Sequence, residues 1–91
     1  MKMTSVIYSH SFYDDVRKVT SSRITQKIPP TIATIQQFPE IGSKRMAPSI
    51  LQEFGPGIRK MVVGPFDLIY LYDEQADSVL IVGLIHHSRA Y

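Results

Sequence analysis

The sequence has 91 residues, of which 44% are hydrophobic, and a formal net charge of +2. This length suits one compact domain spanning residues 1–91, with enough apolar residues for a core. The absence of cysteine excludes disulfides, thiolate catalysis and cysteine-based metal sites. No stretch approaches the roughly 20 apolar residues of a membrane span, so we expect a cytoplasmic protein that uses no metal, no cofactor and no membrane.

The first half of the chain predicts one strand followed by two helices. Alternating β-branched residues indicate a strand over residues 3–9, and Ser11 offers an N-cap for a helix over residues 12–19. Isoleucines recur every three or four residues within residues 23–38 and predict a second helix. The Pro29-Pro30 pair interrupts this pattern, because proline costs roughly 3 kcal/mol inside a helix. We therefore expect either a kink or a helix that restarts with Pro30 in its first turn.

The second half of the chain changes to a period of two. Residues 43–57 are rich in Pro and Gly and predict irregular chain, in which residues 49–54 have the composition of one short helical turn. Strands are expected over residues 58–63, 66–72 and 78–85. The predicted fold class is α+β in the order β-α-α-β-β-β, with two helices packed on one face of a small curved, mostly antiparallel sheet.

Two helices cover only one face of such a sheet, which leaves the other face of its central strand partly open. Ile69 and Leu71, or the residues opposite them on the strand, are predicted to form this open apolar surface. An open apolar face is a natural place for a segment of a partner protein to dock. Association of two copies through the same face is the alternative.

Four motifs occur in a fixed order along the chain. They are Phe38-Pro39-Glu40-Ile41-Gly42, then Gly57-Ile58-Arg59-Lys60, then Val63-Gly64-Pro65-Phe66 with Ile69-Tyr70, and finally a strand followed by His86-His87-Ser88-Arg89. Together with the order of the predicted elements, these motifs resemble the RelE/ParE toxin superfamily over nearly the whole chain. None of them is specific alone, and the resemblance rests on their order and spacing.

The resemblance implies a toxin that is neutralised by a cognate antitoxin, whose acidic, amphipathic tail wraps the toxin and covers its open face. Operator DNA would be bound only through the complex of the two proteins. RelE-like members cut messenger RNA on the ribosome, whereas ParE-like members poison DNA gyrase. The motif at residues 38–42, the strand opening at Arg59 and the ending at residues 86–89 resemble the ParE-like branch more closely. We therefore predict growth arrest through inhibition of DNA gyrase, which needs no catalytic residue.

A ribosome-dependent mRNA endonuclease is the alternative activity. RNA cleavage needs a base, an acid and cations near the phosphate, and the candidates just beyond the last strand are His86, His87, Arg89 and Tyr91. Because a tyrosine near the C-terminus takes part in catalysis by RelE-like ribonucleases, the resemblance implies that role for Tyr91. Asp67, however, stands about where those enzymes carry an arginine, and a carboxylate there would repel a phosphate.

Two pairs of cations are candidates for contact with the target or with a phosphate. Arg59 and Lys60 open a strand, and Lys44 and Arg45 lie in the loop before it. Each pair also has an ordinary structural explanation, because charged residues blunt strand ends and coat solvated loops.

A third possibility for the whole chain is a non-toxic relative that only binds an antitoxin.

Overall fold

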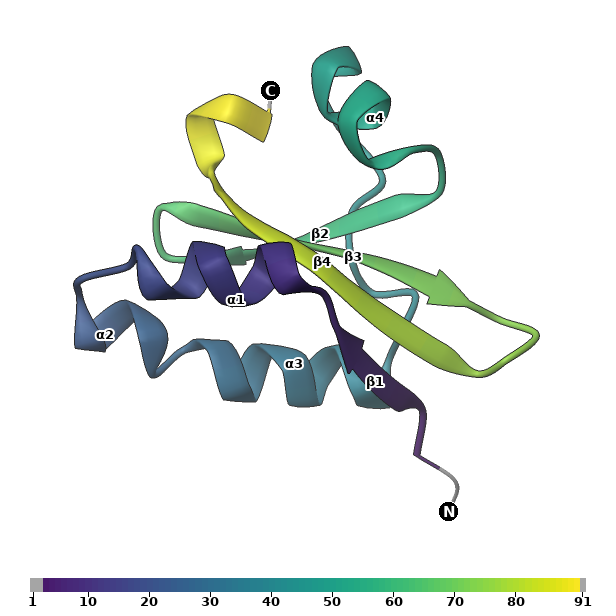
Figure 1. Ribbon diagram of the computed structural model, residues 1–91. Coiled ribbons are helices and arrows are strands. Elements are labelled where there is room, and N and C mark those ends of the chain that lie inside the picture. The colour runs from purple at the N-terminus through teal and green to yellow at the C-terminus, as the bar shows by residue number, and fades with distance from the viewer. Residues whose placement is uncertain (1–2, 91) are drawn as a thin grey trace.

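The computed structural model describes residues 3–90, without the side chains of residues 89 and 90, and contains a four-stranded mixed sheet with helices on both faces (Figure 1). The strands are β1 (Ser5–Tyr8), β2 (Ile58–Val63), β3 (Phe66–Asp73) and β4 (Ser78–His86), in the spatial order β1-β4-β3-β2. β1 pairs with β4 in parallel, whereas β2, β3 and β4 form an antiparallel meander. The predicted α+β class and the four predicted strands are confirmed.

The first helix, α1 (His10–Arg17), begins and ends earlier in the chain than predicted. Ser9, and not Ser11, caps it, because the Ser9 hydroxyl accepts a hydrogen bond from the N–H of Phe12 at 3.1 Å. The same hydroxyl donates to the carbonyl of Val82 at 2.9 Å. This second bond ties the start of α1 to β4 and favours Ser9 over Ser11 as the cap.

The expected second helix consists of two pieces, α2 (Ser22–Thr25) and α3 (Ile28–Gln37). Pro29 lies in the first turn of α3, where a helix residue has no intrahelical partner for its N–H. The alternative of a helix that restarts at the proline pair is therefore the correct one.

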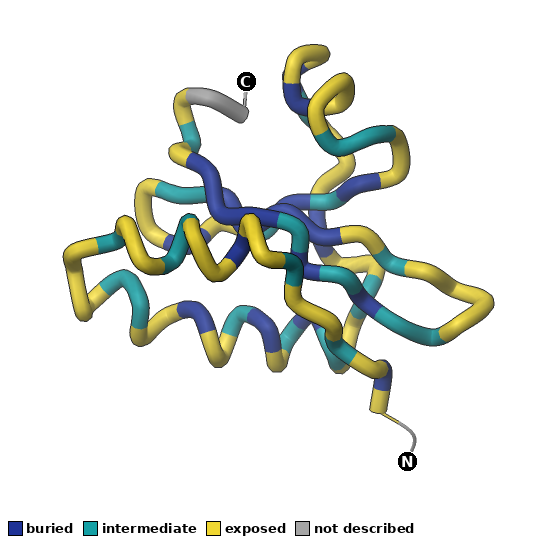
Figure 2. Tube along the Cα trace, viewed as in Figure 1, coloured by how far each residue is buried: buried dark blue, intermediate teal, exposed yellow. Residues whose placement is uncertain are grey.

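α1 and α3 cover one face of the sheet. Buried side chains of these helices pack against buried strand residues, and the set includes Phe12, Ile28, Ile32, Ile35, Leu68, Tyr70, Val79 and Ile81. Figure 2 shows buried segments along the strands in the middle of the molecule, and buried and exposed segments alternating along α3. This cluster is the larger of the two hydrophobic cores.

A further helix, α4 (Pro48–Phe54), covers the opposite face of the sheet (Figure 1). The short helical turn expected at residues 49–54 is thus part of a complete helix that anchors a second core. Ile50, which is 1% exposed, packs there with Ile58, Ile69 and Ile85. After β4 the chain enters a 3₁₀ helix, η1 (His87–Ala90), on the same side of the sheet as α4 (Figure 1).

Candidate functional site

Asp67 and His87 form a buried contact where β3 begins and β4 ends. Nδ1 of His87 lies 3.2 Å and 3.1 Å from the two carboxylate oxygens of Asp67, whose side chain is fully buried. The backbone N–H of His87 also donates to the carbonyl of Pro65 at 2.8 Å. A carboxylate at Nδ1 favours the tautomer that carries its hydrogen there, so Nε2 becomes the basic nitrogen of the ring. The His87 side chain is 42% exposed, so part of the ring meets solvent.

Lys60 lies on the same face of the sheet as Asp67. Val62 is paired with Asp67 and Lys60 with Ile69, which makes Lys60 and Asp67 diagonal neighbours on adjacent strands. Both residues are buried, at 5% and 0% exposure. The contact that the Asp67 carboxylate makes is with His87, so its negative charge is used within the fold.

Arg59 points away from Lys60, because successive residues of a strand face opposite sides of a sheet. Its Nη1 donates to the backbone carbonyls of Glu40 at 2.8 Å and of Gly42 at 3.1 Å. The predicted pair of cations is thus split between two faces, and the guanidinium of Arg59 holds the segment that follows α3.

The sequence presents Tyr70 only as part of a motif, yet this side chain holds the same segment. Its hydroxyl accepts from the N–H of Gly42 and donates to the carbonyl of Pro39, both at 2.8 Å. Burial raises the pKa of Tyr70, while the bond from Gly42 and the charge of Arg59 act in the opposite direction. A tyrosine between Ile69 and Leu71 in a central strand is the sequence signal for such a bond, because a buried hydroxyl needs partners.

The remaining predicted site residues do not converge on one point within the described part of the chain. His86 is exposed, and its Nδ1 lies 2.9 Å from the hydroxyl of Ser88. Lys44 and Arg45 are exposed in the loop before α4. The side chain of Arg89 and the whole of Tyr91 lie outside the described residues.

The open face predicted at Ile69 and Leu71 is wrong for Ile69. This side chain is 0% exposed and packs in the core beneath α4 with Ile50. Leu71 is 36% exposed. The prediction failed because α4, which lies in a segment expected to be mostly irregular, covers this face of the sheet.

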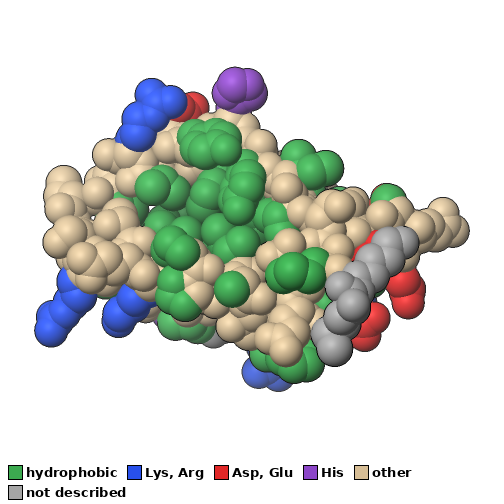
Figure 3. All heavy atoms as spheres, turned by 90° about the horizontal axis from the view of Figure 1, so that it is seen from below, with side chains coloured by type: hydrophobic (Ala, Val, Ile, Leu, Met, Phe, Trp, Pro, Cys, Tyr) green, Lys and Arg blue, Asp and Glu red, His purple; other side chains and the backbone are tan. Residues whose placement is uncertain are grey.

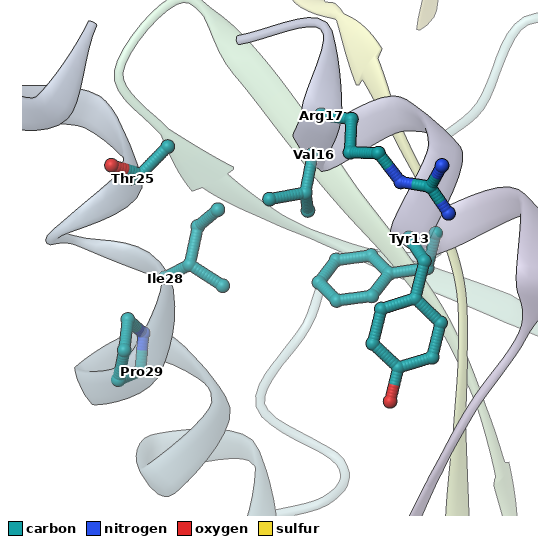
Figure 4. A pocket seen from close by; sticks show the side chains of 7 residues that line it. Tyr13, Val16, Arg17, Thr25, Ile28 and Pro29 are labelled. Carbon is teal, nitrogen blue, oxygen red and sulfur yellow. The ribbon is translucent and has the colours of Figure 1, made fainter.

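An apolar groove lies instead on the other side of the molecule, between α1 and α3 (Figure 3). It has a volume of about 360 Å³ and is lined by Phe12, Tyr13, Val16, Arg17, Thr25, Ile28 and Pro29. Val16 and Ile28 point toward one another across it, and Tyr13 and Arg17 stand on the α1 side (Figure 4). The first turn of α3, which contains Pro29, and the short α2 form its other wall.

Cations surround the end of this groove near α2. Arg17 lines it, Lys18 follows α1, Arg23 lies in α2, and Lys27 precedes α3. Figure 3 shows most of the Lys and Arg side chains of this face at this end, one of them beside a carboxylate, and further carboxylates at the opposite end. Arg17 and Asp14 form an ion pair at 3.6 Å, and both side chains are exposed. Because water screens such a pair, its interaction free energy is small. The groove therefore combines an apolar floor with a positive rim.

Among residues 3–90, no helix is long and apolar enough to cross a membrane. The same residues contain no group of three or more His, Cys, Asp or Glu side chains that could hold a metal ion.

Comparison with known proteins points to one superfamily. Residues 6–91 match the family model described as the ParE toxin of type II toxin–antitoxin systems. The fold resembles the toxin–antitoxin complex RelBE2 from Mycobacterium tuberculosis, with a TM-score of 0.73, 17% identity, and coverage of 94% of this chain and 100% of that one. It also resembles the chromosomal ParDE system from P. aeruginosa, with a TM-score of 0.64, 15% identity, and coverage of 92% and 96%. No curated protein sequence matches the chain.

Proposed function

The chain belongs to the ParE toxin family of type II toxin–antitoxin systems, and from this premise we propose that it arrests bacterial growth in the cytoplasm by inhibiting DNA gyrase. The observation that carries the proposal is the match of the ParE family model to residues 6–91, nearly the whole chain. The solved structures with this fold include both RelE and ParE proteins, so the choice of target draws its support from the family model and from the arrangement of charged residues.

The arrangement of cations favours a toxin that acts by binding. A metal-free ribonuclease gathers several cations where the scissile phosphate will lie. In this chain Arg59 faces away from Lys60 and is bonded to backbone carbonyls. Lys60 is buried, and the buried carboxylate of Asp67 lies diagonally across from it. Among the described residues, this face thus lacks the assembled positive charge that phosphate cleavage requires.

Inhibition of DNA supercoiling tests the proposal directly. The purified chain, titrated at near-stoichiometric ratios to gyrase, is expected to block supercoiling and to trap cleaved DNA. A folded sample that leaves supercoiling and cleavage unchanged would count against the gyrase proposal. A chain that never slows growth, despite soluble expression, would support the non-toxic alternative that only binds an antitoxin.

Ribosome-dependent RNA cleavage is the second candidate, and the contact between Asp67 and His87 favours it. A histidine whose Nδ1 is held by a carboxylate presents Nε2 as the nitrogen that can accept a proton from a substrate. Replacing His87 and Tyr91 together by Ala removes the predicted catalytic groups. Loss of toxicity is expected only if the chain cleaves RNA, and retained toxicity would eliminate this candidate.

We propose that the antitoxin partner docks in the groove between α1 and α3. The tail that the resemblance implies is acidic and amphipathic, which complements the apolar floor and the positive rim formed by Arg17, Arg23 and Lys27. Its apolar residues would occupy the groove beside Val16 and Ile28. This location replaces the face of Ile69, which α4 already covers. Operator DNA would be bound through the complex with the antitoxin.

A further inference from the structure

The turn at Phe38–Gly42 presents two apolar side chains to solvent. Phe38 is 55% exposed and Ile41 is 50% exposed. The N–H of Ile41 donates to the carbonyl of Phe38 at 3.0 Å, which closes the turn and brings the two residues close together. About half of each side chain therefore stays in contact with water, where a partner could cover it.

The core of the protein fixes the shape of this turn. Tyr70, which is 0% exposed, holds both the N–H of Gly42 and the carbonyl of Pro39, and Arg59 holds the carbonyls of Glu40 and Gly42. A side chain at Gly42 would bring its Cβ within 2.6 Å of the Tyr70 hydroxyl. Hydrogen bonds from two side chains of the sheet thus hold a surface turn in one conformation, and a preformed surface loses little conformational entropy on binding.

Carboxylates lie in this turn and in the turn between β3 and β4. Glu40 belongs to the first turn, and Glu74 and Asp77 belong to the second. Thr4, which bonds to Asp77, also accepts a hydrogen bond at its carbonyl from Gln36 at 2.7 Å, two residues before Phe38, so the two turns are neighbours. The Tyr72 hydroxyl is 3.5 Å from Asp77, whose carboxylate also accepts a hydrogen bond from Thr4 at 2.9 Å. The turn therefore has an apolar centre and a negative rim.

We propose that the Phe38–Gly42 turn is the surface by which this toxin binds its target, a protein that offers an apolar pocket bordered by Lys or Arg. This inference rests on the proposed function as a toxin. The occupant is the target because an acidic antitoxin tail would be repelled by Glu40, Glu74 and Asp77, whereas the groove between α1 and α3 attracts it. The two exposed side chains enter the pocket, and the carboxylates pair with its cationic border.

The test replaces the exposed apolar groups while leaving the core intact. In the double variant Phe38→Ser with Ile41→Ser, growth arrest on expression and inhibition of gyrase supercoiling are both expected to weaken by about tenfold or more. The urea midpoint of unfolding is expected to stay that of the parent, because both side chains are already half exposed. Val62→Ser is the matched control, since Val62 is 63% exposed on β2, and it is expected to keep full toxicity.

A charge variant provides a second measurement that does not depend on the apolar pair. Glu40→Lys reverses the charge on the turn, leaves the backbone bonds of Tyr70 and Arg59 in place, and is expected to weaken toxicity by about threefold to tenfold. Full toxicity of both variants would overturn the inference even if gyrase remains the target. A parent chain that arrests growth without affecting gyrase would overturn only the gyrase proposal, because growth arrest still reports on the turn. A parent chain that never arrests growth would remove the toxin premise and this inference with it.

Discussion

The two ends of the molecule differ in charge and in the way each surface is built. The groove between α1 and α3 is an apolar hollow rimmed by cations, and its walls are held by hydrophobic packing. The turn at Phe38–Gly42 is an apolar projection rimmed by carboxylates, and its backbone is held by hydrogen bonds from the core. Surfaces of opposite shape and opposite charge suit two different partners. Under the two proposals above, neutralisation and toxicity use separate parts of this small chain.

The largest expected effect comes from removing the hydroxyl that supports the turn. Tyr70→Phe leaves the N–H of Gly42 and the carbonyl of Pro39 without their buried partner, and is expected to lower the free energy of unfolding by about 3 kcal/mol. Urea denaturation measures this change. Tyr13→Phe is the matched change at the groove, where the side chain is 50% exposed, and we expect a loss within about 0.5 kcal/mol. If the two variants lose the same free energy of unfolding, the turn is no more dependent on a hydroxyl than the groove is.

Removing the guanidinium that supports the same turn is expected to have a smaller effect. Arg59→Met eliminates the bonds to the carbonyls of Glu40 and Gly42, but water reaches at least the first of these carbonyls. The expected loss is about 1–2 kcal/mol by urea denaturation. Toxicity should fall further than stability alone predicts, because the turn loses its fixed shape. Undiminished toxicity at full expression would show that the shape of the turn is unimportant.

Charge reversal at the groove is expected to affect neutralisation and to spare toxicity. The double variant Arg17→Glu with Arg23→Glu should weaken binding of the antitoxin by about tenfold, because it places like charges beside an acidic tail. Calorimetric titration with the antitoxin encoded beside this chain measures the affinity. Glu40→Lys at the opposite end is the control and should leave that affinity unchanged. If Glu40→Lys weakens binding of the antitoxin and the groove variant does not, the antitoxin binds the turn and the assignment of the two surfaces is reversed.

The smallest expected effect concerns alkaline pH. Burial raises the pKa of Tyr70 above the ordinary tyrosine value of 10.0, so the folded state keeps the hydroxyl neutral at a pH where the unfolded chain already ionises. The unfolded state then binds fewer protons than the folded state, and stability falls as pH rises above about 10. Urea midpoints across this range should show the decline, and Tyr70→Phe should reduce it. If the urea midpoint of Tyr70→Phe falls with pH as steeply as that of the parent, other groups cause the decline.

The sequence predicts those elements whose pattern is local. Strand alternation placed β2, β3 and β4 correctly, and the proline pair at residues 29 and 30 indicated where a helix restarts. α4 was expected only as a short turn because it is too brief to be stable alone, and it forms by packing Ile50 on the sheet. Ser9 outcompetes Ser11 as a cap through its bond to Val82, which is distant in sequence.

The candidate site was harder to predict because its geometry depends on pairing between strands. The sequence identified His87 and noted Asp67, but their contact requires β3 and β4 to meet in register. Arg59 and Lys60 were grouped because they are adjacent, whereas strand geometry separates them. The part played by Tyr70 depends on a backbone turn that the sequence presents only as a family motif.

The parallel pairing of β1 with β4 also bears on how the toxin is made in the cell. Ser5 is paired with Ser78, so the strand synthesised first cannot enter the sheet until the strand synthesised last has left the ribosome. Non-local pairings of this kind slow folding. α1, which is joined to β4 through Ser9, must wait in the same way, and so must the groove that it borders. A nascent chain therefore lacks the groove until translation has passed β4, and an antitoxin that recognises this surface can bind only a toxin whose β4 has already been made.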